Sequence, residues 1–190
     1  MVPYHLERGR LVGTGVDDGS MSDAPVPGST ATRTIEFTDP LATARRGMTM
    51  SGLEFLRGMA SGAVPAPPIA VLMNMDIETV EEGRVTFGGT PDGSHYNPIG
   101  IVHGGFAATM LDTVCGCAVH TMLPAGKAYT SIEMKVSYLR PLQQGARVVA
   151  TGTVTKPGSR VAFADATLAT EDGTLIATAS SSLLVFDPRA

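Results

Sequence analysis

The second half of the chain alternates hydrophobic and polar residues in a pattern typical of β-strands. Between Tyr129 and Leu139, apolar and polar side chains fall on opposite faces, with Ile132, Met134, Val136 and Tyr138 against Glu133, Lys135 and Ser137. A period of two residues predicts a half-buried strand. The same pattern predicts strands at 72–80, 84–90, 147–156, 160–170 and 174–186. Short turns at 81–83, 157–159 and 171–173 connect them, and the Asp-Gly pair at 172–173 suits a tight hairpin.

Two segments follow a helical pattern instead. Residues 104–123 are largely apolar, contain Asp112 as their only charged side chain, and are followed by the helix-ending sequence Pro124-Ala125-Gly126. Residues 48–60 carry apolar side chains at helical spacing, with Ser51 and Glu54 placed as a capping box. The prolines within 64–68 predict an extended connection after this second helix.

These elements predict one compact α+β domain. Consecutive strands with short turns form an antiparallel sheet, and the apolar helix can bury itself only against the concave face of that sheet. We therefore expect a curved antiparallel sheet wrapped around one long central helix. The domain is predicted at 48–190, after an N-terminal extension at 1–47 in which 13–30 have linker composition and 31–47 bridge to the domain. Residues 34–37 are predicted as a short edge strand.

Composition and charge narrow the possible functions. The 190 residues are 43% hydrophobic and 17% charged, which is typical of a globular protein. The net charge of −4 argues against a nucleic-acid-binding protein, because such proteins are usually basic. Residues 1–15 contain no continuous apolar stretch and 98–124 are too polar for a spanning helix, so neither a signal peptide nor a membrane segment is expected. Cys115 and Cys117 indicate core thiols in a reducing cytoplasm, without disulfide or metal.

Asp112 is the first candidate for chemistry. It is the only charged side chain between Asp92 and Lys127, and it lies in the middle of an apolar helix. A buried carboxylate costs several kcal/mol unless it is paired. Asp112 is therefore expected to make a structural hydrogen bond, to face outward at a helix kink, or to have a function.

The start of the same helix is the second candidate. His103-Gly104-Gly105 combines two glycines with the free N–H groups of a first helical turn, which can stabilise a developing negative charge. The glycines alone could equally serve the turn, and His103 is more typical of a cap than of a base. Seven residues separate Gly105 from Asp112, about 10 Å along a helix. If both act in catalysis, we therefore expect at least a dimer with two-fold symmetry, with the site at its interface.

Charges are unevenly distributed along the chain. Residues 68–126 carry six acidic side chains and one basic one, whereas 127–160 carry six basic and one acidic. The basic part could hold a phosphorylated ligand, although solubility explains a single Lys or Arg equally well. The chain contains no Gly-x-Ser-x-Gly, no Walker A loop, no His-Glu-x-x-His and no Gly-x-Gly-x-x-Gly.

Several of these segments, taken in order, resemble the hotdog-fold acyl-CoA thioesterases of the phenylacetate-pathway (PaaI) type. The matching residues are 95–105, Leu111-Asp112-Thr113, 131–141 and Asp172-Gly173, within a resemblance that covers about 50–186. The resemblance implies hydrolysis of an acyl-CoA thioester to a free acid and coenzyme A, with no cofactor beyond the coenzyme A of the substrate. It implies a cytoplasmic homodimer that often doubles to a tetramer.

The resemblance also implies roles for individual residues. Asp112 is the nucleophile or general base, and the Gly104 amide, with Gly105 beside it, polarises the carbonyl. Asn97 hydrogen-bonds near that carbonyl or the water, and Ser131, with Thr130, orients the water. Asn97 and Gly104 of one subunit would face Asp112 and Ser131 of the other. The candidates for coenzyme A phosphates are Arg140, Lys156 and Arg160.

Two other functions stay open on this fold. A hydratase or dehydratase of acyl thioesters would need an acid–base His with a partner carboxylate. A non-catalytic protein that binds or senses acyl-CoA would not need Asp112. Aromatic and medium-chain acyl groups are equally compatible with the sequence.

Overall fold

The structure is a computed structural model that describes residues 4–7, 10–13 and 30–188. The chain divides into two compact units, 1–32 and 33–190. In the first unit, β1 (Tyr4–Glu7) and β2 (Arg10–Gly13) pair in an antiparallel two-stranded sheet that the sequence did not predict. Most of the predicted linker lies outside the described residues.

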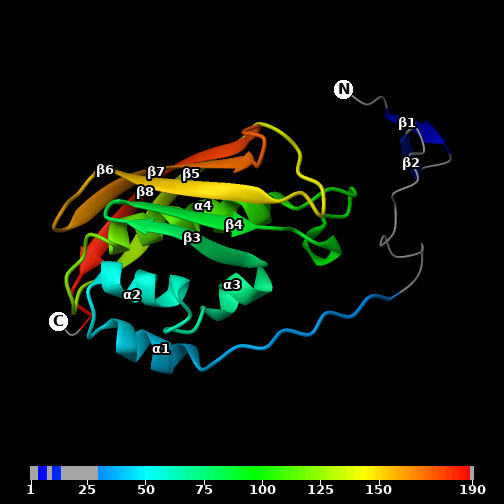
Figure 1. Cartoon of the computed structure of the whole chain (residues 1–190). Helices are drawn as coiled ribbons and strands as arrows, with labels where there is room; N and C mark the ends of the chain where they lie inside the picture. Colours follow the sequence, from blue (N-terminus) through cyan, green and yellow to red (C-terminus); the bar gives the residue numbers. More distant parts are fainter. Residues whose placement is uncertain (1–3, 8–9, 14–29, 189–190) are drawn as a thin grey trace. The chain divides into compact units, whose positions relative to one another are not determined.

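The second unit contains the predicted antiparallel sheet (Figure 1). Its six strands lie in the order β3-β4-β6-β7-β8-β5, and every neighbouring pair is antiparallel. The strands are β3 (Met75–Glu81), β4 (Arg84–Gly89), β5 (Ala128–Tyr138), β6 (Val148–Lys156), β7 (Val161–Thr170) and β8 (Leu175–Phe186). Gly173 has a φ of 85° in the turn between β7 and β8, which confirms the Asp-Gly hairpin.

The central helix α4 (Gly104–His120) packs against five of these strands, β4 to β8, as the apolar pattern predicted. Its buried side chains include Phe106, Met110 and Leu111, which form the core together with the inner face of the sheet. A Cβ atom at Gly152 of β6 would collide with the Val114 carbonyl of α4, so this glycine lets the two backbones approach closely. The predicted α+β fold is confirmed.

Strand β5 lies at the edge of the sheet and departs from simple alternation. Its register with β8 shifts between Ser131 and Glu133, so that Ile132 is the extra residue of a β-bulge. Before the bulge, Tyr129 packs on the core, and after it Met134 and Val136 do so. The prediction that Ile132 shares their face is wrong, because the bulge changes which residues face the helix. Ile132 is 55% exposed.

Three helices precede the sheet: α1 (Pro40–Gly47), α2 (Gly52–Ala60) and α3 (Pro68–Leu72). The capping box of Ser51 and Glu54 is confirmed: Ser51 is the N-cap, α2 starts directly after it at Gly52, and Glu54 lies in the first turn. The other two helices were not predicted. At α3, Pro68 occupies the first helical position, where a missing N–H costs nothing, so the second proline of the pair begins a helix instead of extending the connection. Strand β3 therefore begins at Met75, later than predicted.

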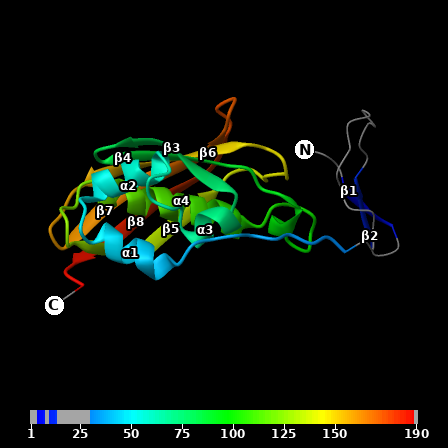
Figure 2. The same ribbon diagram turned by 60° about the horizontal axis from the view of Figure 1, so that its bottom comes forward.

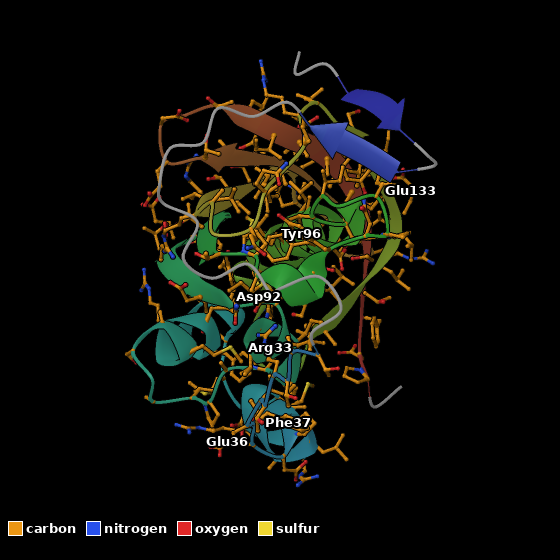
Figure 3. The ribbon with its side chains drawn as sticks, turned by 90° about the vertical axis from the view of Figure 1, so that its right-hand side faces the viewer. Arg33, Glu36, Phe37, Asp92, Tyr96 and Glu133 are labelled. Atoms are coloured by element: carbon orange, nitrogen blue, oxygen red, sulfur yellow. The ribbon has the colours of Figure 1, made fainter. Side chains whose placement is uncertain are left out.

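The segment before α1 is extended but pairs with no strand, so the predicted edge strand at 34–37 is wrong. A side-chain anchor at Arg33 holds the start of this segment instead. The Arg33 guanidinium donates to the Val71 carbonyl at 2.9 Å and lies 3.3 Å from an Asp92 carboxylate oxygen. Figure 3 shows Arg33 next to Asp92, with Phe37 further along the chain. Because of this anchor, the compact unit begins at Arg33, before the predicted residue 48. The division into an N-terminal extension at 1–47 and a thioesterase domain at 48–190 stays a prediction.

Within the described residues, no helix is long and apolar enough to cross a membrane. Both cysteines are buried and reduced. Burial, followed by the negative charge of Asp112, raises the pKa of the Cys115 and Cys117 thiols to about 12. They are protonated at neutral pH, which agrees with the predicted role as core thiols.

Candidate active site

The start of α4 is capped by its own flanking histidine. His103 Nδ1 accepts the Gly105 N–H at 2.8 Å, and the His103 N–H donates to the His95 carbonyl at 2.8 Å. No group in the described part of the chain accepts the N–H of Gly104. The structure therefore separates two glycines that the sequence treated together: the Gly105 amide is used by the cap, and the Gly104 amide is available to a ligand.

Asn97 closes the loop that leads into this helix. Its Oδ1 accepts the N–H of Ile99 at 3.0 Å and that of Ile101 at 3.3 Å. The side-chain nitrogen Nδ2 makes no hydrogen bond with a described residue, and Asn97 lines a cavity of about 380 Å³. His103, Gly104 and Arg140 line the same cavity. Four of the predicted site residues therefore meet in one place.

The cavity also contains residues that the sequence analysis did not single out. Tyr138 lies beside the helix start, where a Cβ atom on Gly104 would be 3.2 Å from its ring. Leu139, Pro141, Leu142 and Ile176 belong to the same wall. The position of Tyr138 directly before the Leu139-Arg140-Pro141 segment is the only sequence signal for it, since the contact of its ring with Gly104 joins the end of β5 to the start of α4.

Asp112 and Ser131 form a second group, on α4 and the edge strand β5. The Ser131 hydroxyl donates to an Asp112 carboxylate oxygen at 2.7 Å. The expectation of a buried carboxylate is wrong for the single chain, in which Asp112 is only half-buried. A hydroxyl that donates to one carboxylate oxygen leaves the other free to accept a proton.

The bulge in β5 explains why Ser131 rather than Thr130 reaches the carboxylate. Side chains of successive strand residues point to opposite faces, so Thr130, which pairs with Leu184, points away from the helix. Of these two predicted residues, the structure brings only Ser131 to Asp112.

The two groups are separate within one chain. Gly104 and Asp112 lie eight residues apart on α4, about 12 Å along its axis. A carbonyl group hydrogen-bonded to the first therefore lies beyond the reach of the second in the same chain.

The three predicted phosphate ligands do not form one cluster. Arg140 lines the cavity at the helix start, where its guanidinium also donates to the Leu175 carbonyl at 2.7 Å. Lys156 lies at the other end of the sheet, 6.0 Å from the centre of the Phe163 ring, and Arg160 lies next to the β6–β7 turn.

One histidine–carboxylate pair does occur, but outside these two groups. His95 Nδ1 accepts the Asp92 N–H at 2.9 Å and lies 3.1 Å from the Asp92 carboxylate, while Nε2 lies 3.2 Å from the Leu72 carbonyl. Its side chain is 7% exposed. Both ring nitrogens are engaged by protein groups, so this pair is structural: it holds the loop between β4 and α4.

Comparisons with known proteins identify the family. The family model of the thioesterase superfamily matches residues 99–177. Human acyl-coenzyme A thioesterase 13 is 31% identical over 108 residues, which cover 56% of this chain and 76% of that protein. A thioesterase family protein from Silicibacter pomeroyi is 27% identical, with a TM-score of 0.63 over 70% of this chain and 98% of that one. The PaaI protein of the phenylacetic acid degradation operon of Escherichia coli, at 20% identity, shares the fold with a TM-score of 0.63 over 72% and 96%.

The match of 99–177 contains Gly104, Asp112 and Ser131, and the chain covers more than two thirds of the human relative. The chain therefore belongs to the thioesterase superfamily, as a hotdog-fold thioesterase of the PaaI type.

Proposed function

We propose that this protein hydrolyses acyl-CoA thioesters in a site shared between two copies of the chain. One copy supplies the Gly104 amide and Asn97, and the other supplies Asp112 and Ser131. No cofactor takes part beyond the coenzyme A carried by the substrate. The observation that carries this proposal is the separation of the two groups on α4. Because of it, one chain cannot act on a single carbonyl with both groups.

Each half has the chemistry that thioester hydrolysis needs. The Gly104 N–H, at the positive end of a 17-residue helix, suits the negative charge that develops on the carbonyl oxygen. The half-buried carboxylate of Asp112 suits a general base, and the Ser131 hydroxyl orients it and the attacking water.

The reaction proceeds by addition and elimination. A water oxygen attacks the thioester carbon as the partner's Asp112 removes a water proton. The tetrahedral oxyanion forms against the Gly104 N–H. The C–S bond then breaks, the coenzyme A thiolate takes the proton that Asp112 removed from water, and the free acid remains.

The edge of the sheet supports a dimer. Among the strands that the structure describes, β5 has only β8 as a neighbour, which leaves one row of its backbone groups without a paired strand. Three apolar side chains near it are about half exposed, Ile132 at 55%, Tyr138 at 56% and Leu139 at 50%. A second copy placed along β5 would cover this edge and bring its own α4 close to Asp112. Doubling of such a dimer to a tetramer stays an expectation from the family.

The cavity at the helix start suits the coenzyme A part of the substrate. Arg140 supplies the positive charge that a phosphate needs, at the wall that also carries Gly104. Lys156 and Arg160 stay candidates for phosphates only if the bound coenzyme A reaches the other end of the sheet.

A complementation experiment tests the shared site. Asp112→Asn and Gly104→Pro chains carry different tags, are co-expressed, and are purified as mixed dimers. Each variant alone is expected to lack activity, whereas the mixed dimer contains one intact site and recovers roughly half of the wild-type rate per dimer. An inactive mixed dimer, or a fully active monomer, would overturn the proposal.

The rival functions give different outcomes with the same protein. An acyl-CoA-binding protein without activity would bind acyl-CoA and release no thiol. A hydratase would add water to an enoyl-CoA, but both ring nitrogens of His95 are already engaged and His103 Nδ1 holds the Gly105 amide. Thiol release from a panel of acyl-CoAs separates the three.

A further inference from the structure

Arg33 ties the segment before α1 to the rest of the compact unit. Figure 2 shows this extended segment passing α3 on its way to α1. The Arg33 side chain is only 25% exposed, although the residues on either side of it are exposed. The match to the family model begins at residue 99, so Arg33 lies outside the part of the chain that the family defines.

The Arg33 guanidinium joins two segments that are distant in the sequence. Its Nη2 donates to the Val71 carbonyl at 2.9 Å and to Asn74 Oδ1 at 2.6 Å, at the end of α3 and in the turn that follows it. Its Nη1 donates to Ser94 Oγ at 3.2 Å and lies 3.3 Å from an Asp92 carboxylate oxygen. Asn74 Nδ2 donates to the same oxygen at 3.0 Å. The fixed fork of donors on a guanidinium suits such a junction.

Asp92 belongs to the loop that leads into the helix start. It is the N-cap of a short 3-10 helix, η1 (Gly93–His95), and its N–H donates to His95 Nδ1 at 2.9 Å. Figure 3 shows Asp92 between Arg33 below it and Tyr96, the residue after η1, above it. Arg33 therefore holds η1 at the end that is away from α4.

Two contacts connect η1 with the helix start. The His95 carbonyl accepts the His103 N–H at 2.8 Å, and the His95 ring lies edge-on to the Phe106 ring of α4, with 5.0 Å between ring centres. His103 then accepts the Gly105 N–H at 2.8 Å. The Gly104 N–H lies between these two bonded residues, so its direction is set by η1.

We propose that Arg33 is a positioning residue for thioester hydrolysis: it fixes η1 and, through His95 and His103, the direction of the Gly104 N–H. This inference rests on the proposed function. An oxyanion donor is effective because it is fixed before the charge develops. A misplacement of about 1 Å caused by a distant substitution can lower a rate by about 10²-fold. The segment before α1 is then part of the working site.

A second arginine provides the matched control. Arg46 Nη1, on α1, donates to the Ala63 carbonyl at 2.8 Å, in the connection between α2 and α3. None of its side-chain hydrogen bonds in the described part of the chain reaches η1 or the loop before α4. Arg46→Met therefore removes an anchor of the same chemical type from the same part of the chain, but without a path to the helix start.

Steady-state kinetics with acyl-CoA, measured by thiol release, compares the two arginines. Arg33→Met keeps the apolar stem of the side chain and removes every donor. Its kcat is expected to fall by about 10- to 100-fold, with KM within about twofold, because positioning of the amide acts on the transition state. Arg46→Met should keep kcat within about twofold. Equal losses of kcat in the two variants, or a change in KM alone, would overturn the proposal.

Thermal melting shows whether each variant folds. If Arg33→Met does not fold, Arg33→Lys replaces it, since an ammonium group keeps the charge but cannot bridge both segments with a fork of donors. Its kcat should fall by about 2- to 10-fold, the range expected for one lost hydrogen bond. A wild-type kcat in Arg33→Lys would then overturn the proposal.

A double-mutant cycle tests whether Arg33 acts through the Gly104 amide. Gly104→Pro has no N–H to position, so adding Arg33→Met should change its residual kcat by less than about twofold. Ser131→Ala alters the other half of the site and keeps the amide, so adding Arg33→Met should lower its kcat by the full factor. Equal further losses in the two backgrounds would show that Arg33 does not act through the amide.

Hydrogen exchange of backbone amides, followed by NMR, separates this inference from the proposed function. Arg33→Met should speed exchange of the His103 and Gly105 amides by about tenfold or more, because their bonded loop opens more easily, whereas Arg46→Met should not. If no acyl-CoA is hydrolysed but this pattern appears, the proposed function fails and Arg33 still holds the helix start. If hydrolysis occurs and the two variants match in kcat and in exchange, the inference about Arg33 fails alone.

Discussion

The two halves of the candidate site are built in different ways. At the helix start, backbone groups supply the chemistry, and the loop around them is held by hydrogen bonds from Asn97, His103 and His95. At Asp112, two side chains supply it, joined by one hydrogen bond on a half-buried helix face next to a sheet edge. The first half is rigid before any ligand arrives, as an oxyanion donor must be. In the proposed dimer, the second half obtains its full environment when another chain covers the edge.

The largest effect is expected at the carboxylate. Asp112→Asn keeps the size of the side chain and can still bond to Ser131, but it cannot accept a proton from water. A general base contributes about 10²- to 10⁴-fold, so kcat should fall within that range. Wild-type rates in purified Asp112→Asn, with an unchanged melting temperature, would exclude the role.

The role of the helix start can be tested by removing the amide hydrogen of Gly104. Gly104 occupies the first helical position, and His103 before it has φ −62° and ψ 137°, so a proline fits the backbone at 104. Gly104→Pro removes the N–H, and kcat should fall by about 10²- to 10³-fold, the loss typical of an oxyanion donor.

Gly104→Ala is the control for this change. It keeps the N–H and places a Cβ 3.2 Å from the Tyr138 ring, which tests crowding alone. If the alanine and proline variants lose the same activity, the amide is not the cause.

A smaller effect is expected from Ser131, whose hydroxyl the bulge in β5 places against the Asp112 carboxylate. A hydrogen bond to a charged group contributes about 1.5–3 kcal/mol, so Ser131→Ala should lower kcat by about 10- to 100-fold. Thr130→Val, on the opposite face of the strand, should change kcat by less than about twofold. Equal losses in the two variants would show that the strand, and not the hydroxyl, carries the effect.

The smallest effect concerns pH and stability. Burial lowers the pKa of His120 below the ordinary value of 6.5. The unfolded chain then binds the proton more readily, so the free energy of unfolding is greatest above pH 6.5 and decreases as the pH falls through the lowered value. The tilted rings of His120 and Tyr129 lie 5.3 Å apart between their centres, and Tyr129 precedes Ser131 by two residues. As the pH falls, we therefore expect the part of the site around Asp112 and Ser131 to lose its structure before the helix start does.

Urea denaturation at pH 7.5 and pH 5.5 measures this dependence. His120→Phe keeps the aromatic packing against Phe55 and Tyr129 and should reduce the difference between the two pH values. A variant with the full pH dependence of the wild type would assign the effect to another group.

Much of the fold could be predicted from local patterns. The strands of the second half and the central helix follow the predicted alternation and apolar run, because each pattern reports which face of a single element is buried. The helices α1 and α3 were missed since both are short. The extended residues 34–37 were misassigned since Arg33, through contacts with Val71 and Asp92, holds them without a paired strand.

The site was predicted less completely than the fold. The sequence indicated Asp112 by its isolation among apolar residues and the helix start by its glycines. It did not indicate the Tyr138 ring as part of the cavity at the helix start, because β5 approaches the start of α4 only through folding of distant segments.

The sequence by itself determined which groups could act: one carboxylate in an apolar helix and a glycine-rich helix start too far from it for a single chain. The resemblance put Gly104 before Gly105 and Ser131 before Thr130, and only the tertiary structure gave a physical reason for each choice. The first choice depends on the side chain of His103 and the second on a bulge against β8. Local periodicity does not report the geometry of these contacts. The sequence pattern could therefore indicate each pair of neighbouring residues but not the contact that distinguishes them.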